Sequence, residues 1–162
     1  MTDARDNAGV IAPPPLIALA AVVLGLALDW LAPAYLLAML LSLTERIVIG
    51  IILFAAGGAL AFPAIRAFRS AGTHVEPWKP ALALATTGIY GYMRNPMYVG
   101  LGFLVASIGI ALASDWTLVM LVAAVLVLHF GVVRREERYL EVKFGEAYRQ
   151  YIAKVPRYGW PF

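Results

Sequence analysis

The sequence predicts an all-α, polytopic membrane protein of about four transmembrane helices with a helical cytoplasmic C-terminal segment. Apolar residues make up 62% of the 162-residue chain and charged residues only 14%. Soluble domains have roughly 45–50% apolar and about 25% charged residues. The apolar residues also gather in long runs without charge, which are typical of membrane spans. Because the chain has no cysteine, disulfides, thiolate catalysis and cysteine-ligated metal sites are excluded.

Four apolar runs are candidate spans. The first two cover residues 14–32 and 47–68, and Gly57-Gly58 in the second permits close approach of a neighbouring helix. The third, residues 97–113, is near the lower length limit for a span. A polar Ser114-Asp115 break separates it from the fourth, residues 116–133. The apolar run 35–43 is too short to span, and the sequence leaves open whether it is embedded in the membrane.

We expect three parts along the chain. Residues 1–12 form a mobile N-terminal tail, because they carry charges but lack the basic and apolar regions of a signal peptide. Residues 13–69 form an N-terminal pair of transmembrane helices. Residues 70–162 form a cofactor-binding module, consisting of a cytoplasmic loop, a transmembrane hairpin and a C-terminal helical tail.

The distribution of basic residues predicts the orientation in the membrane. Lysines and arginines concentrate in residues 66–94 and 134–157, whereas the first loop holds only Arg46 and the 114–115 turn holds none. Short cytoplasmic loops are the ones enriched in Lys and Arg. Both termini and the polar segments should therefore lie on the cytoplasmic face, in the inner membrane if the protein is prokaryotic.

Polar side chains are expected to converge at that face. If the fourth run continues as a helix, Glu136 projects from the same side as His129. The hairpin would bring Glu136 close to Arg94, to Asn95 and to the hydroxyls of Tyr90 and Tyr98. Taken singly, these residues also fit interfacial anchors or an exposed charged face. His74 is the only histidine besides His129, so no multi-histidine metal site can form and no metal is expected.

An ordered set of motifs is more specific than the spacing. It comprises Thr73-x-Val-x-Pro77, Thr87-Gly-Ile-Tyr90, Arg94-Asn-Pro-Met-Tyr98, Glu136-Glu-x-x-Leu140, Phe144-Gly-x-x-Tyr148-x-x-Tyr151 and Val155-Pro-Arg157. Over about residues 70–161 the chain resembles the isoprenylcysteine carboxyl methyltransferase family, within a wider group that includes phospholipid methyltransferases, and we take it for a short member of bacterial or archaeal type.

The resemblance implies S-adenosylmethionine as cofactor, membrane lipids as surroundings and a lipophilic acceptor, with no nucleic-acid partner and no indication of oligomeric state. By position, Arg94, Asn95 and Glu136 would be catalytic, and Arg134, Arg135 and His129 would bind substrate. The implied cofactor contacts are Leu82, Ala83, Leu84, Ala85, Tyr90, Asn95, Pro96, Met97, Tyr98 and Glu136.

Two departures from the family pattern leave the acceptor open. Asn95 stands where family members commonly have histidine, and Val132 stands where the eukaryotic enzymes have a substrate-binding arginine. The implied reaction is carboxyl O-methylation of an isoprenylcysteine-like substrate. The alternatives are a phospholipid amine N-methyltransferase, a thiol S-methyltransferase, a membrane reductase with a similar C-terminal pattern, and a non-catalytic protein of the same fold.

Overall fold

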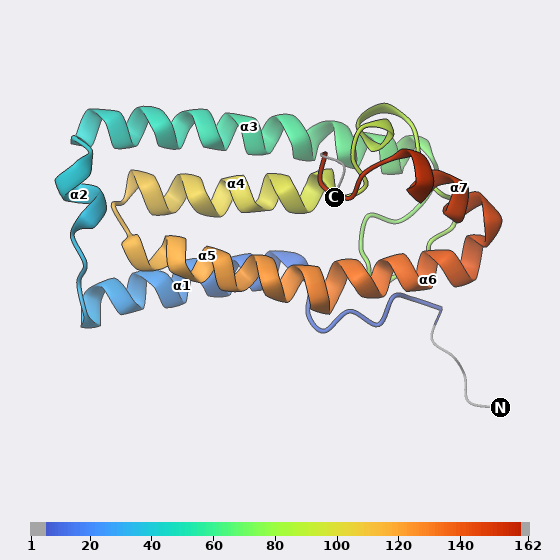
Figure 1. The fold of residues 1–162 in the computed structure, drawn as a ribbon, viewed down its shortest axis with the longest axis horizontal. Coiled ribbons are helices and arrows are strands. Elements are labelled where there is room, and N and C mark those ends of the chain that lie inside the picture. Colours follow the sequence, from blue (N-terminus) through green and yellow to red (C-terminus); the bar gives the residue numbers. More distant parts are fainter. Residues whose placement is uncertain (1–5, 160–162) are drawn as a thin grey trace.

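The structure, a computed structural model, describes residues 6–159, and these are helical with no strand. The long helices lie side by side and are joined by shorter helical pieces (Figure 1). In chain order the elements are α1 (Pro14–Leu31), α2 (Leu36–Leu40), α3 (Leu43–Ser70), the 3₁₀ turn η1 (Gly88–Gly91), α4 (Pro96–Ala111), α5 (Asp115–Leu128), the π-helical turn η2 (His129–Val133), α6 (Arg134–Phe144) and α7 (Glu146–Lys154). The predicted all-α class is confirmed.

Three helical stretches are long and apolar enough to cross a membrane: α1, α3 and the continuous helix Asp115–Phe144. The charged helix α6 ends the third stretch, so its apolar part covers residues 115–133. Helix α4 is apolar but has only 16 residues, which is ~24 Å at 1.5 Å per residue. The predicted polytopic architecture therefore holds, with three full-length candidate spans and one shorter helix.

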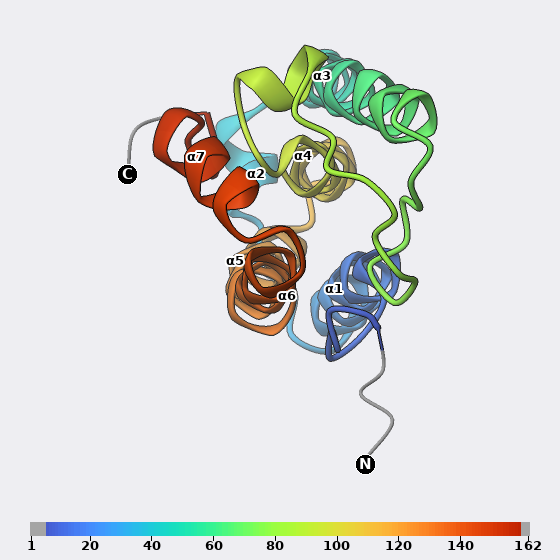
Figure 2. The same ribbon diagram turned by 90° about the vertical axis from the view of Figure 1, so that its right-hand side faces the viewer.

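Consecutive long helices run in opposite directions, so the connections gather at two ends of the bundle (Figures 1 and 2). One end carries α2 and the 112–114 turn. The other, which we call the charged end, carries residues 6–13, the loop 71–95 and residues 134–159. The three polar segments that the basic residues assigned to one face thus do lie at one end of the molecule.

Small residues let the helices approach closely. A side chain at Gly57 of α3 would come within 2.8 Å of the Gly100 carbonyl oxygen of α4, and the converse holds for Gly100. On the other side of the bundle, any side chain at Gly25 of α1 would overlap Thr117 of α5. The predicted close contact at Gly57 is confirmed, while Gly58 faces open space. Outward-facing residues of α3 such as Ile51 and Phe54 are exposed, as a lipid-facing surface requires.

Side-chain hydrogen bonds tie α2 to the start of α5. The Asp115 carboxylate accepts from the N–H groups of Leu36 at 2.9 Å and Leu37 at 3.1 Å, the first residues of α2. Ser114 donates to Asp29 and contacts Thr117 in the same region. The Ser114-Asp115 segment between α4 and α5 therefore connects this hairpin to α1 and α2.

At the charged end, residues 6–12 contact the η2–α6 helix. Arg135 Nη1 donates to the Gly9 carbonyl oxygen at 2.8 Å, and the Ile11 N–H donates to the Gly131 carbonyl oxygen at 3.2 Å. Residues 1–5 of the expected tail lie outside the described residues. For residues 6–12 the structure gives defined contacts, and the expected mobility stays a prediction.

Candidate functional site

A cleft opens at the charged end between α4, α6, α7, η1 and the loop that precedes η1. Its open space, including the mouth, is about 820 Å³. It is lined by Ala8, Phe68, His74, Val75, Glu76, Pro77, Lys79, Ala81, Ala83, Leu84, Ala85, Tyr90, Arg94, Asn95, Met97, Tyr98, Glu136, Glu137, Tyr139, Leu140, Tyr148 and Tyr151. Both acidic and basic side chains and backbone groups face this space, so the cleft is suited to a polar ligand with charged groups.

Glu136 provides a carboxylate that has no cationic partner. It lies in the first turn of α6, beyond the apolar part of its helix, and is half-buried. The Tyr98 hydroxyl contacts both carboxylate oxygens at 2.9 Å, and no basic side chain among residues 6–159 forms an ion pair with it. Burial raises the pKa of the Glu136 carboxyl to about 7, although the Tyr98 hydrogen bond opposes that rise. The site would therefore favour a ligand that brings positive charge.

Glu137 holds two arginines beside the cleft. Its Oε1 pairs with Arg94 Nη1 at 2.9 Å, and Arg157 donates to both of its oxygens at 2.7 and 2.8 Å. Only 12% of the Arg94 side chain and 17% of the Glu137 side chain are exposed. Because such pairs are shielded from water, they constrain side-chain position strongly. Arg94 is thereby held at the cleft wall by Glu137 and not by Glu136.

Asn95 links α4 to the C-terminal segment. Its backbone N–H and its side-chain Nδ2 both donate to the Arg157 carbonyl oxygen at 3.2 Å, and the Arg94 N–H donates to the Pro156 carbonyl oxygen at 3.0 Å. Asn95 is also a buried residue, 8% exposed. An amide can donate here without changing charge. In this structure Asn95 therefore anchors residues 156–157 next to the cleft.

Tyrosines complete the inner wall. Tyr90 is buried at 5% exposure and stacks edge-on against Phe68, with the ring centroids 5.1 Å apart. The Tyr151 hydroxyl of α7 donates to the Tyr90 carbonyl oxygen at 2.7 Å. Tyr148 is buried beside them, and burial raises the pKa of its phenol to about 12. These phenols stay neutral at physiological pH and present aromatic surface to the cleft.

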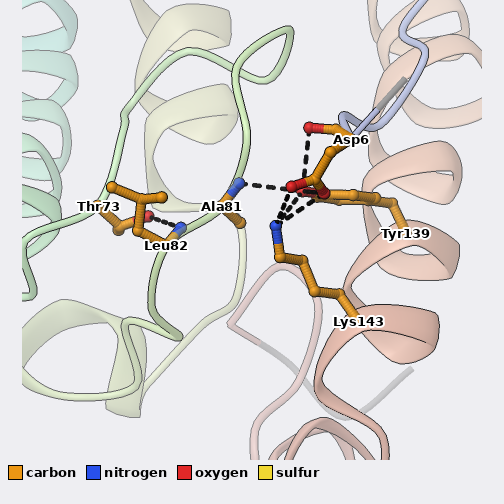
Figure 3. Close-up of polar contacts among 6 residues, drawn as sticks. All are labelled: Asp6, Thr73, Ala81, Leu82, Tyr139 and Lys143. Atoms are coloured by element: carbon orange, nitrogen blue, oxygen red, sulfur yellow. Dashed lines mark hydrogen bonds and ion pairs between the residues drawn. The ribbon is translucent and has the colours of Figure 1, made fainter. Parts of the chain in front are cut away.

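The loop before η1 offers backbone groups to the cleft. The Ala81 N–H donates to the Tyr139 hydroxyl at 3.0 Å and the Leu82 N–H to Thr73 Oγ1 at 2.9 Å (Figure 3). These two bonds fix the start of the loop. The next three residues, Ala83 to Ala85, line the cleft. Among the described residues, their N–H groups donate to no protein acceptor, so they remain free to bind a ligand.

The cleft brings together all three residues expected to be catalytic and most of the expected cofactor contacts. The expected residues that line it are Ala83, Leu84, Ala85, Tyr90, Arg94, Asn95, Met97, Tyr98 and Glu136. Leu82 is 63% exposed and Pro96 is buried at the first turn of α4, and neither is among the lining residues. The roles of all these residues stay predictions.

The three residues expected to bind substrate lie outside the cleft lining. Arg134 stacks over the Phe130 ring, and Arg135 binds the Gly9 carbonyl oxygen. His129 Nδ1 lies 2.8 Å from the Tyr158 hydroxyl. The π-helical turn His129–Val133 separates His129 from Glu136, so the α-helical spacing assumed from the sequence does not apply between them.

Thirteen of the 22 lining residues were not among the expected site residues, and they include Ala8, Glu137, Tyr139 and Tyr148. Glu137 and Tyr148 lie within the ordered motifs, so that pattern could have found them. Tyr139 stands at a variable position of the Glu136-Glu-x-x-Leu140 motif, and nothing in the sequence near Ala8 indicates a site. Among the described residues, no group of three or more His, Asp or Glu side chains could hold a metal ion.

Comparisons with known proteins identify the family of the chain. Residues 45–147, more than half of the chain, match the family model described as phospholipid methyltransferase. The chain belongs to the phospholipid methyltransferase family. It is also 40% identical over 75 residues to the protein-S-isoprenylcysteine O-methyltransferase of Schizosaccharomyces pombe (strain 972 / ATCC 24843). That match covers 45% of this chain and only 31% of the yeast protein. No solved structure matches the chain.

The region shared with the phospholipid methyltransferase family contains most of the cleft. It runs from the first turn of α3 into α7 and includes Arg94, Tyr98, Glu136 and Glu137. It leaves out α1, α2, the N-terminal residues that contact α6, and residues 148–159, which include the lining residues Tyr148 and Tyr151. Segments outside the shared region therefore also contribute to the walls of the cleft.

Proposed function

We propose that this protein is an S-adenosylmethionine-dependent methyltransferase of the membrane that acts on a lipophilic acceptor. The observation that carries the proposal is Glu136, a half-buried carboxylate in the cleft that no basic side chain of the described residues neutralises. A partly buried carboxylate without a cationic partner is costly, and a ligand that carries positive charge lowers that cost. S-adenosylmethionine carries a sulfonium and an ammonium group.

The remaining lining of the cleft also fits this cofactor. Free backbone N–H groups at Ala83 to Ala85 can donate to the ring nitrogens of a purine. Tyr90 and Phe68 provide aromatic surface for a planar ring. Arg94 supplies a guanidinium that suits a carboxylate. The cofactor, when bound, would supply an activated methyl group.

The protein's own contribution would be positioning. The Glu137 ion pairs and the Asn95 hydrogen bonds hold the cleft walls in place. A methyl transfer to an acceptor that is already deprotonated requires no general base, so alignment of acceptor and methyl group would provide most of the rate. The cleft lies where α4 begins and where α5 passes through η2 into the charged helix α6, so an acceptor with an apolar tail could stay in the bilayer while its polar head reaches the site.

Calorimetric titration tests the cofactor. Purified protein in nanodiscs should bind S-adenosylmethionine and S-adenosylhomocysteine, and Glu136→Gln should weaken binding of the former about tenfold to a hundredfold, as loss of a charge-assisted contact does. The matched control is Arg138→Gln, because Arg138 is an exposed residue of the same helix outside the cleft lining. Absence of binding to the unmodified protein would refute the proposal.

The two similarities point to different acceptor atoms for the methyl group. Similarity to the yeast enzyme favours carboxyl O-methylation of an isoprenylcysteine-like substrate, whereas the family description favours N-methylation of a phospholipid amine. Membranes containing the protein should be incubated with methyl-labelled S-adenosylmethionine, and the labelled lipids identified by mass spectrometry. Label in an ethanolamine headgroup would support N-methylation, label in a base-labile ester would support O-methylation, and label in a thioether would support S-methylation.

A further inference from the structure

We propose that residues 6–12 form a strap that gates the cleft, closed at one end by a polar latch of Asp6, Tyr139 and Lys143 and anchored at the other end by Ile11. The identity of the ligand rests on the proposed function, but the proposal that the strap gates the cleft does not. The strap lies outside the region shared with the phospholipid methyltransferase family. The family match therefore does not cover this part of the cleft wall.

The strap contributes directly to the cleft wall. Ala8 lines the cleft together with Tyr139 of α6 and with His74, Glu76 and Lys79 of the opposite loop. Residues 6–12 run along the outside of the η2–α6 helix (Figures 1 and 2). The strap therefore forms the part of the cleft wall where α6 meets the loop 74–81, and its displacement would widen the opening there.

The latch joins three segments that are far apart in the sequence. The Tyr139 hydroxyl donates to Asp6 Oδ1 at 2.8 Å while it accepts from the Ala81 N–H at 3.0 Å and from Lys143 Nζ at 3.0 Å (Figure 3). Lys143 Nζ also contacts both Asp6 oxygens at 2.7 Å. One donor and two acceptor sites saturate a phenolic hydroxyl. The strap is thus connected through Tyr139 to Ala81, which begins the loop segment that lines the cleft at Ala83 to Ala85.

The two ends of the strap differ in how firmly they are held. Any side chain at Gly131 would overlap Ile11, so the glycine lets Ile11 pack directly against the helix. The Ile11 N–H also donates to the Gly131 carbonyl oxygen. The Asp6 side chain, by contrast, is 58% exposed. Solvent-exposed ion pairs stabilise weakly and are screened by salt. The latch should therefore open readily while the Ile11 anchor stays in place.

The backbone of the strap turns at Gly9, between its two ends. Gly9 has a φ of +57°, and its N–H donates to Asn7 Oδ1 at 2.9 Å. Such a left-handed turn favours glycine. Because a rotation at Gly9 would carry Asp6 and Ala8 away from α6 without disturbing Ile11, this residue is the natural hinge of the strap.

The rate at which a cysteine in the cleft wall is modified shows how open the strap is, and this measurement needs no cofactor. The chain has no cysteine, so Ala85→Cys places one reporter in the cleft wall. A charged methanethiosulfonate reagent should modify it up to about fivefold faster when Asp6→Asn or Lys143→Met is added, which is the shift an exposed ion pair produces. The exchanged pair Asp6→Lys with Lys143→Asp should restore the slow rate. Equal rates in all these backgrounds would overturn the proposal.

Two controls make the comparison specific. Lys154→Met removes a different exposed lysine, in α7, and should leave the Ala85→Cys rate unchanged. A reporter at Ala147→Cys, exposed on α7 and outside the cleft lining, should react at one rate with or without the latch. A general loosening of the fold would accelerate both reporters, and that result would also count against a gate.

Locking the strap tests its effect on the ligand. Asp6→Cys with Lys143→Cys, bridged by a short reducible bifunctional methanethiosulfonate, should slow S-adenosylmethionine association about tenfold or more, and a reductant should restore the rate. Unchanged association in the bridged protein would overturn the gate. If the reduced protein binds no cofactor at all, the proposed function fails, while the Ala85→Cys rates still decide the gate.

Discussion

At the scale of single residues, Glu136 is the most informative side chain of the molecule. Among residues 6–159 its carboxyl has one hydrogen-bond partner, Tyr98, and its raised pKa reflects burial first and the neighbouring Glu137 last. A residue of this kind disfavours the unliganded folded state above the ordinary pKa of a glutamate. The charge of Glu136 should therefore affect both ligand binding and the stability of the fold.

Cofactor binding should depend on pH through Glu136. The carboxyl, with a pKa of about 7, must be ionised to attract a sulfonium or ammonium group, so protonation competes with binding below pH 7. Affinity for S-adenosylmethionine should rise about tenfold from pH 6 to pH 8 and level off above. Calorimetry at several pH values measures this. Glu136→Gln should give a flat profile, and an equally steep profile in that variant would assign the dependence to another group.

The same variant should be more stable than the unmodified protein without ligand. A carboxyl whose pKa is raised in the folded state keeps its proton between pH 4.5 and 7, where the unfolded state releases it, so folding loses stability as pH rises through that range. Glu136→Gln, which preserves an acceptor for Tyr98, should therefore add stability on the order of 3 kcal/mol at pH 8. The gain should shrink at pH 5. Thermal unfolding in detergent measures it, and a lower Tm at pH 8 would contradict the argument.

The hairpin of the third and fourth apolar runs predicted that Arg94, Tyr98 and Glu136 would meet, and the structure places them around one cleft. The partner of Arg94 was not predictable. Adjacent glutamates on a helix differ by about 100° in direction, and only the packing of α6 decides that Glu137 faces Arg94 while Glu136 faces Tyr98. For Asn95 the sequence indicated a site residue, and the structure shows it bonded to Arg157.

At the scale of helices, close packing through glycine orders the bundle. Gly57 and Gly100 let α3 approach α4, and Gly25 lets α1 approach α5. In a membrane, association of helices depends on such contacts, because burial from water no longer contributes there. The apolar runs were sufficient to predict the helices, but which glycines meet another helix depends on their rotation about the helix axes.

Gly25→Ala should separate α1 from α5. A methyl group at this position would overlap the Thr117 backbone, and overpacking of this kind costs about 1–3 kcal/mol. The variant should unfold at a lower temperature in detergent, as followed by circular dichroism. Gly58→Ala is the matched control, because no atom lies within 4 Å of its new methyl group, and it should be neutral or slightly stabilising. Equal Tm values for both variants would refute the packing argument.

The π-helical turn is another element that only the structure revealed. Residues 129–133 continue the helix from α5 into α6 without a sequence break. Such turns change the angular spacing of side chains and are frequent at functional sites. Here the turn exposes the Gly131 carbonyl oxygen to Ile11, so it also provides the anchor point of the strap.

At the scale of the whole molecule, the segments rich in Lys and Arg gather at one end. The N-terminal strap, the loop 71–95 and the C-terminal helices lie together there (Figure 1). The concentration of Lys and Arg in these segments favours the cytoplasmic side. We therefore expect the cleft to open to the cytoplasm.

Impermeant thiol labelling of intact cells tests this orientation. Ala147→Cys at the charged end should be labelled only after the membrane is permeabilised, whereas Thr44→Cys at the opposite end should be labelled from outside. The cysteine-free chain makes each signal specific. The reverse pattern would place the cleft on the outer face and would conflict with use of a cytoplasmic cofactor.

The sequence by itself determined the membrane class, the helices, the end at which polar groups gather and the motifs of the family, because composition, run length and residue order are local properties. The tertiary structure decided which residues meet. The pairing of Glu137 with two arginines, the seat of Ile11 on Gly131 and the position of Ala8 in the cleft wall all join segments far apart in the chain. Such contacts depend on helix rotation and packing, which no local pattern encodes.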